Sequence, residues 1–446
     1  MKKLILSVLL IPAVFSAQQT VSRDAEIANY VSQVSADSLK SHINKLVSLG
    51  TRHTMSSTTD AKKGIGAARN WVLSKFKNYA KNTDGRMEVF LQSQTIQPDG
   101  KRINQPTDLG NAIAILRGTD PNDKRIFMIG GHLDSRVSDV MNNKDFAPGA
   151  NDDGSGVGAV IESARILSQS KFPATIVFVA FSGEEQGLLG AKMLAEKAKT
   201  ENWQLEALLN NDMIGNNLTS ETNLINANQL RVFSEGLPQF DLDKKAQGIR
   251  NLGLENDGEA RQLARYIKEI GERYVDNLEV KLIYRNDRFL RGGDHTSFVN
   301  QGFSAVRLTE FNENYDHQHQ DIRKENGKQF GDLPEFMDFE YFKKNVGVNV
   351  SVLANLAKSP SKPENVKMDV KELTNFTTIH WEKPKNGEVV GYYVLMRETD
   401  SSTWQKKFFT KENSMKLPYS KDNYFFAVQA VNSSGNESLI VIPSVK

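Results

Sequence analysis

The sequence predicts an α/β fold with a mostly parallel central sheet and helices on both faces, followed by a small all-β sandwich. Three observations support this prediction. At 446 residues the chain exceeds one ordinary domain. Apolar β-branched runs alternate with helical patterns as far as Lys358, and short alternating strands follow from residue 364. Strands that alternate with helices of this length form a largely parallel sheet covered on both faces.

The first half of the main domain is expected to begin with a charged helical segment and continue as strands. We predict a helical segment over residues 24–49, then strands at 87–95, 111–116 and 125–130. The Gly-Ser-Gly-Val-Gly-Ala sequence at Gly154 opens a helix that reaches about Ser168. The β-branched run at 175–181 predicts the next strand, and a helix follows over 188–200.

The second half continues the same alternation. A strand is predicted at 204–210, and residues 258–274 form a strongly periodic helix. Strands at 278–284 and 304–308 and a final helix over 340–358 complete the main domain.

The composition limits the classes of partner. Hydrophobic residues make up 39% and charged residues 25%, as in soluble globular proteins. The formal net charge is only +2, and no basic run is interleaved with aromatic residues, so we expect no nucleic-acid partner. The absence of cysteine excludes disulfides, thiolate zinc sites and cysteine nucleophiles.

The N-terminus has the pattern of a cleavable signal peptide at residues 1–17. Lys2-Lys3 precedes the apolar run from Leu4 to Phe15, and Ser16-Ala17 supplies small residues before the cut. The run is too short to span a bilayer comfortably, and no second one follows. We therefore expect a secreted protein, extracellular or periplasmic, without a membrane span.

The Ser/Pro/Lys segment at 359–363 is typical of a linker. It separates the main domain, residues 18–358, from the C-terminal part, residues 364–446. That part resembles a fibronectin type III module, with Trp381 on an early strand, a Gly-Tyr-Tyr-Val strand and Tyr-x-Phe-x-Val-x-Ala-Val near the end. Trp381 is expected in its core. The expected role is contact with a surface or polymer, or covering the main domain.

Two adjacent glutamates, Glu184 and Glu185, follow the strand predicted at 175–181. Adjacent carboxylates repel each other, and here they lie on a strand-to-helix turn, where open α/β sheets place their chemistry. Three further groups of hard ligands each follow a predicted strand or open a helix: His132-Leu-Asp134, Asp152-Asp153 and Asp212. Buried carboxylates need a cation or protons to offset desolvation, so the sequence predicts a metal site.

These residues provide what a site for two divalent ions requires. Such a site uses a bridging carboxylate, terminal ligands, a bridging hydroxide and a separate base. Asp134 lies two residues after His132 and is placed to orient its ring. One of the two glutamates can bind metal while the other faces the water as the base. The Gly-rich helix start at 154–158 lacks the Lys and spacing of a phosphate loop.

The ordered motifs GGHLDS, APGANDDGSG, SGEEQGLLG, NNDMIG and GGDHTSF resemble the co-catalytic zinc exopeptidases of metallopeptidase family twenty-eight. The resemblance covers roughly residues 34–358 and implies the zinc exopeptidase fold and two zinc ions. It implies that His132 binds one metal, that Asp152 bridges, and that Glu185 and Asp212 complete the ligand set. Glu184 would be the general base that activates the metal-bridging hydroxide, and the Asp152–Asp153 peptide would be cis.

The last metal ligand is left open by the sequence. The family ends its set with a histidine after a tyrosine-bearing loop, and here Tyr315 is followed by both His317 and His319. The spacing from Tyr315 favours His319, whereas a family-like His-x-x-x-Asp spacing favours His317. We take His319 as the ligand and keep His317 as the alternative.

The candidates for substrate binding are Asp294, Met213 and Tyr315, whereas His42, His53 and His380 are expected to be surface or structural residues. From these motifs we predict a metallo-aminopeptidase that acts on the N-termini of peptides or proteins. A carboxypeptidase or a glutaminyl cyclase on the same fold is the alternative, and a non-catalytic binding protein is a third. The arginines near the motifs, namely Arg288, Arg291 and Arg307, are scattered along the sequence, which argues against a carboxylate-gripping cluster.

Overall fold

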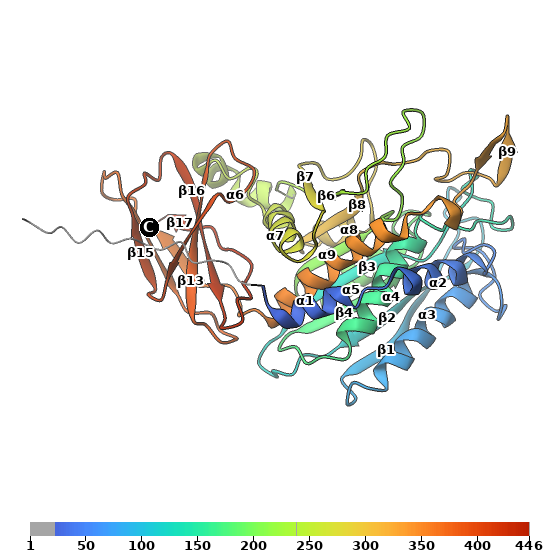
Figure 1. Cartoon of the computed structure of the whole chain (residues 1–446), viewed down its shortest axis with the longest axis horizontal. Helices are drawn as coiled ribbons and strands as arrows, with labels where there is room; N and C mark the ends of the chain where they lie inside the picture. The colour runs from blue at the N-terminus through green and yellow to red at the C-terminus, as the bar shows by residue number, and fades with distance from the viewer. Residues whose placement is uncertain (1–22, 238, 446) are drawn as a thin grey trace, which may run out of the picture.

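A computed structural model describes residues 23–237 and 239–445, and Figure 1 shows its two parts, an α/β domain and a β-sandwich. The fold class predicted from the sequence is confirmed. The predicted signal peptide, residues 1–17, lies outside the described residues. No helix among the described residues combines the length and apolarity that crossing a membrane requires.

The α/β domain is built on an eight-stranded sheet of order β1-β2-β4-β3-β5-β8-β6-β7. The strands are β1 (Met87–Ile96), β2 (Thr107–Leu116), β3 (Arg125–His132), β4 (Thr175–Phe181), β5 (Gln204–Asn211), β6 (Gln229–Phe233), β7 (Glu279–Ile283) and β8 (Ala305–Glu310). The four central strands β4, β3, β5 and β8 are mutually parallel, whereas β1 and β2 pair antiparallel at one side. The turns after β3, β4 and β5 therefore meet at one edge of the sheet, the usual location of a site in such folds.

Helices cover both faces of this sheet, and β4 shows why. Ile176, Phe178 and Ala180 are buried in one core, whereas Val177, Val179 and Phe181 are buried in another on the opposite face. Helices α5 (Leu189–Thr200) and α8 (Asp294–Val299) pack on the second core. The first core is shared by α1 (Ala25–Ser32), α2 (Ala36–Val47), α3 (Gly64–Ala80), α4 (Gly154–Leu167), α7 (Glu259–Tyr274) and α9 (Phe339–Lys358).

The helical segment predicted over residues 24–49 forms two helices, α1 and α2, with a break before Ser35. The Ser35 side chain accepts a hydrogen bond from Ser38 N and caps α2, while its own N–H donates to Glu162 of α4. A residue that caps one helix has extended backbone and cannot continue another. The elements not predicted are α3, α6 (Gln239–Leu252), α8, β6, the hairpin β9 (Arg323–Glu325) with β10 (Lys328–Phe330), and the 3-10 turn η1 (Pro334–Phe336).

The C-terminal part is a sandwich of a four-stranded sheet, β15-β12-β11-β17, and a three-stranded sheet, β14-β13-β16. Trp381 is buried in its core and meets Tyr392 edge-on at 5.3 Å between ring centroids. The strands are β11 (Glu364–Met368), β12 (Thr377–Glu382), β13 (Gly391–Glu398), β14 (Lys406–Thr410), β15 (Ser414–Leu417), β16 (Tyr424–Val431) and β17 (Ser444–Val445). The predicted linker at 359–363 lies between α9 and β11, where the Ser359 and Pro360 carbonyls accept hydrogen bonds from Arg125.

The sandwich packs against α7 through a buried ionic interface. Glu437 is fully buried and pairs with Arg273 of α7 at 2.6 Å and with Lys407 of β14 at 3.3 Å. Asp257, which precedes α7, pairs with Arg265 at 2.8 Å and with Arg397 of β13 at 2.7 Å. Removing one member of a buried ion pair leaves the other uncompensated, so these residues tie the two parts together.

Glu437→Gln is expected to destabilise the protein at neutral pH by about 3–5 kcal/mol, the usual cost of breaking a buried ion pair. Burial opposes the charged form of Glu437, but Lys407 and Arg273 outweigh it and lower the pKa of this carboxyl below its ordinary value. The lowered pKa contributes stability that is present above the ordinary glutamate pKa and is lost as the pH falls through the folded-state pKa. Urea unfolding at pH 7 and at pH 3–4 measures both effects.

The difference in unfolding free energy between wild type and Glu437→Gln should therefore shrink at the lower pH. Glu412→Gln is the matched control, because Glu412 is an exposed glutamate of the same sandwich. Equal stability of Glu437→Gln and Glu412→Gln at pH 7 would contradict a stabilising role for the interface.

Candidate metal centre

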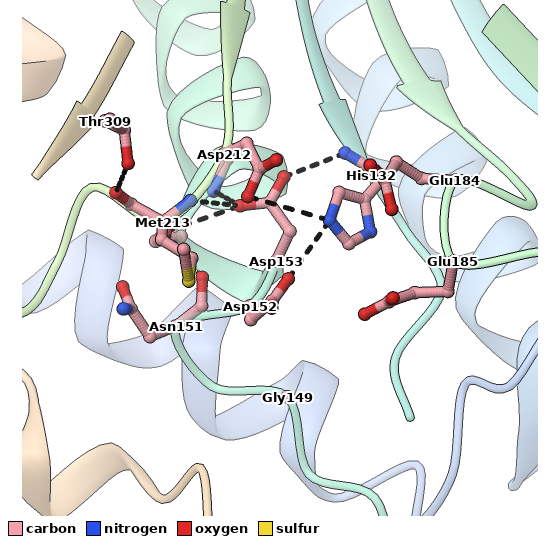
Figure 2. Close-up of polar contacts among 12 residues, drawn as sticks. His132, Gly149, Asn151, Asp152, Asp153, Glu184, Glu185, Asp212, Met213 and Thr309 are labelled. Carbon is pink, nitrogen blue, oxygen red and sulfur yellow. Dashed lines mark hydrogen bonds and ion pairs between the residues drawn. The ribbon is translucent and has the colours of Figure 1, made fainter. Parts of the chain in front are cut away.

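The predicted ligands come together at the carboxyl edge of the central strands. His132 is the last residue of β3, Asp212 follows β5, and Glu184 and Glu185 lie in the turn after β4. Asp152 lies in the loop that leads into α4. Figure 2 shows the His132 ring in contact with Asp152 and Asp212, with the two glutamates on the other side of the ring, in the turn after β4.

Two imidazoles face opposite oxygens of one carboxylate. The Nε2 atom of His132 lies 3.1 Å from Asp152 Oδ1, and the Nε2 atom of His319 lies 2.9 Å from Asp152 Oδ2. His319 Nε2 also lies 2.8 Å from Glu185 Oε1, and His132 Nε2 lies 3.9 Å from Asp212 Oδ1. A carboxylate with an imidazole at each oxygen is placed to bridge two ions.

Two groups of three ligands share Asp152. His132, Asp152 and Asp212 form one group, and Asp152, Glu185 and His319 form the other, with the ligand atoms of each group within 4.8 Å of one another. Imidazole nitrogens and carboxylate oxygens without thiolate suit a divalent cation such as zinc, cobalt or manganese. The side chains present therefore fit two metal ions.

In each group the terminal carboxylate, Asp212 or Glu185, contacts an arginine through one oxygen and an imidazole through the other. Asp212 turns Oδ2 toward Arg307 at 3.1 Å and Oδ1 toward His132. Glu185 turns Oε2 toward Arg136 at 3.0 Å and Oε1 toward His319. One oxygen of each carboxylate thus remains for a cation, because the arginine occupies the other.

Asp134 fixes the position of its neighbours rather than lining the site. Its main-chain carbonyl lies 3.1 Å from His132 Nδ1, which directs Nε2 toward Asp152. Its carboxylate lies farther from that ring, at 3.8 Å, and accepts hydrogen bonds from the N–H groups of residues 183–185. The expected orientation of the His132 ring therefore comes from the Asp134 carbonyl. The Asp134 carboxylate instead holds the turn that carries Glu184 and Glu185.

Two further aspartates hold the loop that carries Asp152. Asp153 caps α4 by accepting from Gly156 N, and it accepts from the N–H of His132 at 2.8 Å. Asp332 accepts from the N–H of Asp152, also at 2.8 Å. The Asp152–Asp153 peptide is cis, as the family resemblance implied. Main-chain donors and a helix start thus offset much of this buried negative charge.

The charges around Glu184 suit it to accept a proton. Burial, together with the nearby carboxylates of Glu185 and Asp212, raises the pKa of Glu184 well above its ordinary value. No side chain among the described residues donates a hydrogen bond to the Glu184 carboxylate, which forms part of the wall of a cavity. A base whose pKa approaches the working pH transfers protons efficiently.

The pKa values of Asp152 and His319 are shifted in opposite directions. Burial opposes ionisation of Asp152, but His319 and His132 outweigh it and hold the Asp152 pKa well below its usual range. Burial also opposes charge on His319, yet Glu185 and Asp152 raise its pKa to about 10. A protonated imidazole and a cation compete for the same position, so metal binding here releases protons.

The structure places His319, and not His317, in the cluster. The His317 ring stacks on Phe336 with 3.6 Å between ring centroids. Burial lowers the pKa of His317 to about 4, so its ring is neutral at ordinary pH. The histidine in the cluster is therefore His319, which the spacing from Tyr315 had favoured.

The predicted substrate-binding residues lie apart from the main cavity. Tyr315 is exposed at the surface, and its N–H donates to Ser220 Oγ. Met213 is buried with φ 59° and lines a small enclosed space on the other side of Asp152. Asp294 is fully buried at the start of α8, where burial raises its pKa to about 8. None of the three lines the cavity in front of the ligands.

That cavity, of about 410 Å³, is bounded by arginines. Besides the ligands and Glu184, its wall contains Arg102, Arg136, Arg288, Arg291 and Gln318. The expectation that arginines would stay scattered is wrong, because folding brings four arginines from three separate segments to one wall. Arg136 had a signal in the sequence, since it directly follows the GGHLDS motif, and Arg307 is a charged residue inside an apolar strand.

The remaining histidines fulfil the expected structural or surface roles. His42 is buried near Glu162, and His53 is buried with Nε2 at 2.9 Å from the Val140 carbonyl. His380 is on the surface of the sandwich and pairs with Asp369. None of these three belongs to either ligand group.

Comparison with known proteins agrees with this geometry. Residues 111–333 match the family model of peptidase family M28, and residues 361–443 match the fibronectin type III domain. A probable zinc metalloprotease of Leptosphaeria maculans is 42% identical over 421 residues, which is 94% of this chain and 97% of that protein. The chain belongs to peptidase family M28.

Solved structures of similar fold include aminopeptidases. The LapA aminopeptidase of Legionella pneumophila has a TM-score of 0.54 at 19% identity and covers 80% of each chain. A leucine aminopeptidase precursor of Bacteroides thetaiotaomicron has a TM-score of 0.50 at 15% identity, covering 75% of this chain and 99% of the other. At these identities the likeness establishes the fold.

His319→Ala is expected to reduce the bound divalent metal from about two ions per chain to about one, because only one of the two groups contains His319. His317→Ala is the matched control and should keep both ions, since His317 stacks on Phe336 outside both groups. Elemental analysis after dialysis against metal-free buffer gives the stoichiometry. Loss of metal in His317→Ala alone would reverse the assignment.

Proposed function

We propose that this M28 peptidase is a di-zinc aminopeptidase that removes the N-terminal residue of peptides. The observation that carries the proposal is that His132 and His319 face the two oxygens of Asp152. The relatives named as probable zinc metalloproteases support zinc as the metal. Zinc ions held by the two groups would act as Lewis acids and would lower the pKa of a water molecule.

The residues of the chain supply the other parts of the reaction. Asp152 shares its two oxygens between the ligand groups and keeps them close together. Glu184 has a raised pKa, and no side chain among the described residues donates a hydrogen bond to its carboxylate. It accepts the proton of the attacking water and returns it to the leaving amine. The carboxylates near the cavity can also hold the positively charged α-amine of a substrate, which would select its N-terminal position.

The alternatives differ in what the site must contain. A glutaminyl cyclase is expected to use a single zinc, whereas both three-ligand groups are present here. A binding protein has no need of a free carboxylate like that of Glu184. A carboxypeptidase remains the second candidate, and a specific observation favours it, because four arginines line the cavity.

We also propose that the protein is secreted, on the basis of the signal-like sequence at residues 1–17. The contact of the sandwich with a surface or polymer stays a prediction. The interface with α7 supports the other expected role, since one outer face of the sandwich covers the α/β domain.

The aminopeptidase proposal predicts that leucyl-p-nitroanilide is hydrolysed while its N-acetyl form is not. Acetylation removes the charge on the α-amine that the carboxylates would hold. An N-blocked dipeptide with a free C-terminus tests the carboxypeptidase in the same assay. Preference for the blocked dipeptide would overturn the proposal and establish the second candidate.

Glu184→Gln serves as the control that the measured activity belongs to this site. The amide keeps the size of the side chain but cannot accept the proton, so kcat should fall by about 100- to 10,000-fold. Its metal content should stay that of wild type, because Glu184 is in neither group that shares Asp152, and the third group, which it forms with His132 and Glu185, draws those two residues from the groups that do. Full activity in this variant would show that another residue is the base.

A further inference from the structure

The four arginines of the cavity wall differ in how much of their hydrogen-bonding capacity the protein uses. Arg136 contacts Glu185 and His319, at 3.0 and 2.6 Å. Arg288 pairs with Asp287 at 3.3 Å and with Glu313 at 3.0 Å. These two guanidinium groups are held by protein acceptors and stabilise the wall of the cavity.

The guanidinium groups of the other two arginines, Arg102 and Arg291, have few or no acceptors within the protein. Arg102 donates one N–H to the carbonyl of Glu185 at 2.7 Å, and the residue is otherwise exposed. The Arg291 guanidinium has no hydrogen-bond or ion-pair partner within the described part of the chain, although it lines the same cavity. Arg291 therefore presents the donors of an entire guanidinium group to whatever occupies the cavity.

The base of the loop that carries Arg291 is fixed. Asp287 is fully buried at its side chain and accepts from Arg307 at 2.7 Å, and Arg307 in turn contacts Asp212. Asn286 is held through its carbonyl by His295 Nε2 at 2.9 Å. The segment leading to Arg291 is thus tied to a metal-ligand carboxylate, which keeps the loop next to the reacting groups.

We propose that Arg291, with Arg102 beside the same cavity, binds a carboxylate of the substrate. A guanidinium group matches a carboxylate through two parallel charge-assisted hydrogen bonds. The carboxylate has two sources in a peptide, namely the side chain of an N-terminal Asp or Glu and the C-terminal carboxylate of a very short peptide. The inference deepens the proposed peptidase function and makes anionic peptides the preferred substrates.

The test compares kcat/KM of full-length wild type and Arg291→Gln on matched pairs. Glutamyl- and leucyl-p-nitroanilide differ in a side-chain carboxylate, and Leu-Gly and Leu-Gly-amide differ in a terminal carboxylate. Wild type should prefer the anionic member of at least one pair, and that pair identifies the source. Arg291→Gln should lower this preference by about 10- to 100-fold, the effect of losing hydrogen bonds to a charged group.

Arg285→Gln is the matched control. Arg285 is an exposed arginine next to the same loop, but it lies over the Phe289 ring at 3.9 Å and is not part of the cavity wall. The preference of this variant should equal that of wild type. Absence of any anionic preference in wild type, or an equal loss on both members of the preferred pair in Arg291→Gln, would overturn the proposal.

The same design separates this inference from the proposed aminopeptidase. N-acetyl-Leu-Gly and its amide are included as a further pair. If only N-blocked peptides are cleaved, the aminopeptidase proposal fails, but the acid-to-amide preference and its loss in Arg291→Gln still decide the role of Arg291. Metal content and circular dichroism of the variants establish that they are folded and loaded.

Discussion

The structure depends on how buried carboxylates are compensated at one edge of the sheet. Asp152, Asp153, Glu185 and Asp212 are all buried around His132. Burying an unpaired charge is very costly, so each of these groups needs a partner. Main-chain N–H groups serve Asp153, arginines serve one oxygen of Glu185 and of Asp212, and imidazoles face the oxygens that remain. The oxygens that face the imidazoles are therefore placed to hold a divalent cation such as zinc.

The scaffold holds the carboxylates together in spite of their repulsion. Parallel strands bring the turns after β3, β4 and β5 to one edge, and the two apolar cores fix the sheet between its helices. The sandwich adds buried ion pairs on α7, which packs on the same core as α9. A chain without disulfides thus obtains its rigidity from apolar burial and from largely buried charge pairs.

The sequence predicted the parts of the site that are local. His132, Asp152, Glu184 and Asp212 could be identified because each follows a recognisable strand or opens a helix, and strand ends meet by topology. The contacts of Arg307 with Asp212 and of Asp332 with Asp152 could not be predicted, because only tertiary packing brings these residues together. The position of the break at Ser35 within the predicted helical segment was not predicted for the same reason, since the Ser35 N–H donates to Glu162 of α4. The cavity wall was also missed, because Arg102, Arg136, Arg288 and Arg291 converge only in the fold.

We propose that Asp152 bridges two metal ions. Anomalous diffraction at the zinc absorption edge, measured on crystals of the purified protein, tests this proposal. We expect two peaks about 3.5–4 Å apart, one on each side of the Asp152 carboxylate. One peak should be ligated by His132 and Asp212, and the other by Glu185 and His319. A single peak, or a pair of peaks that does not share Asp152, would contradict it.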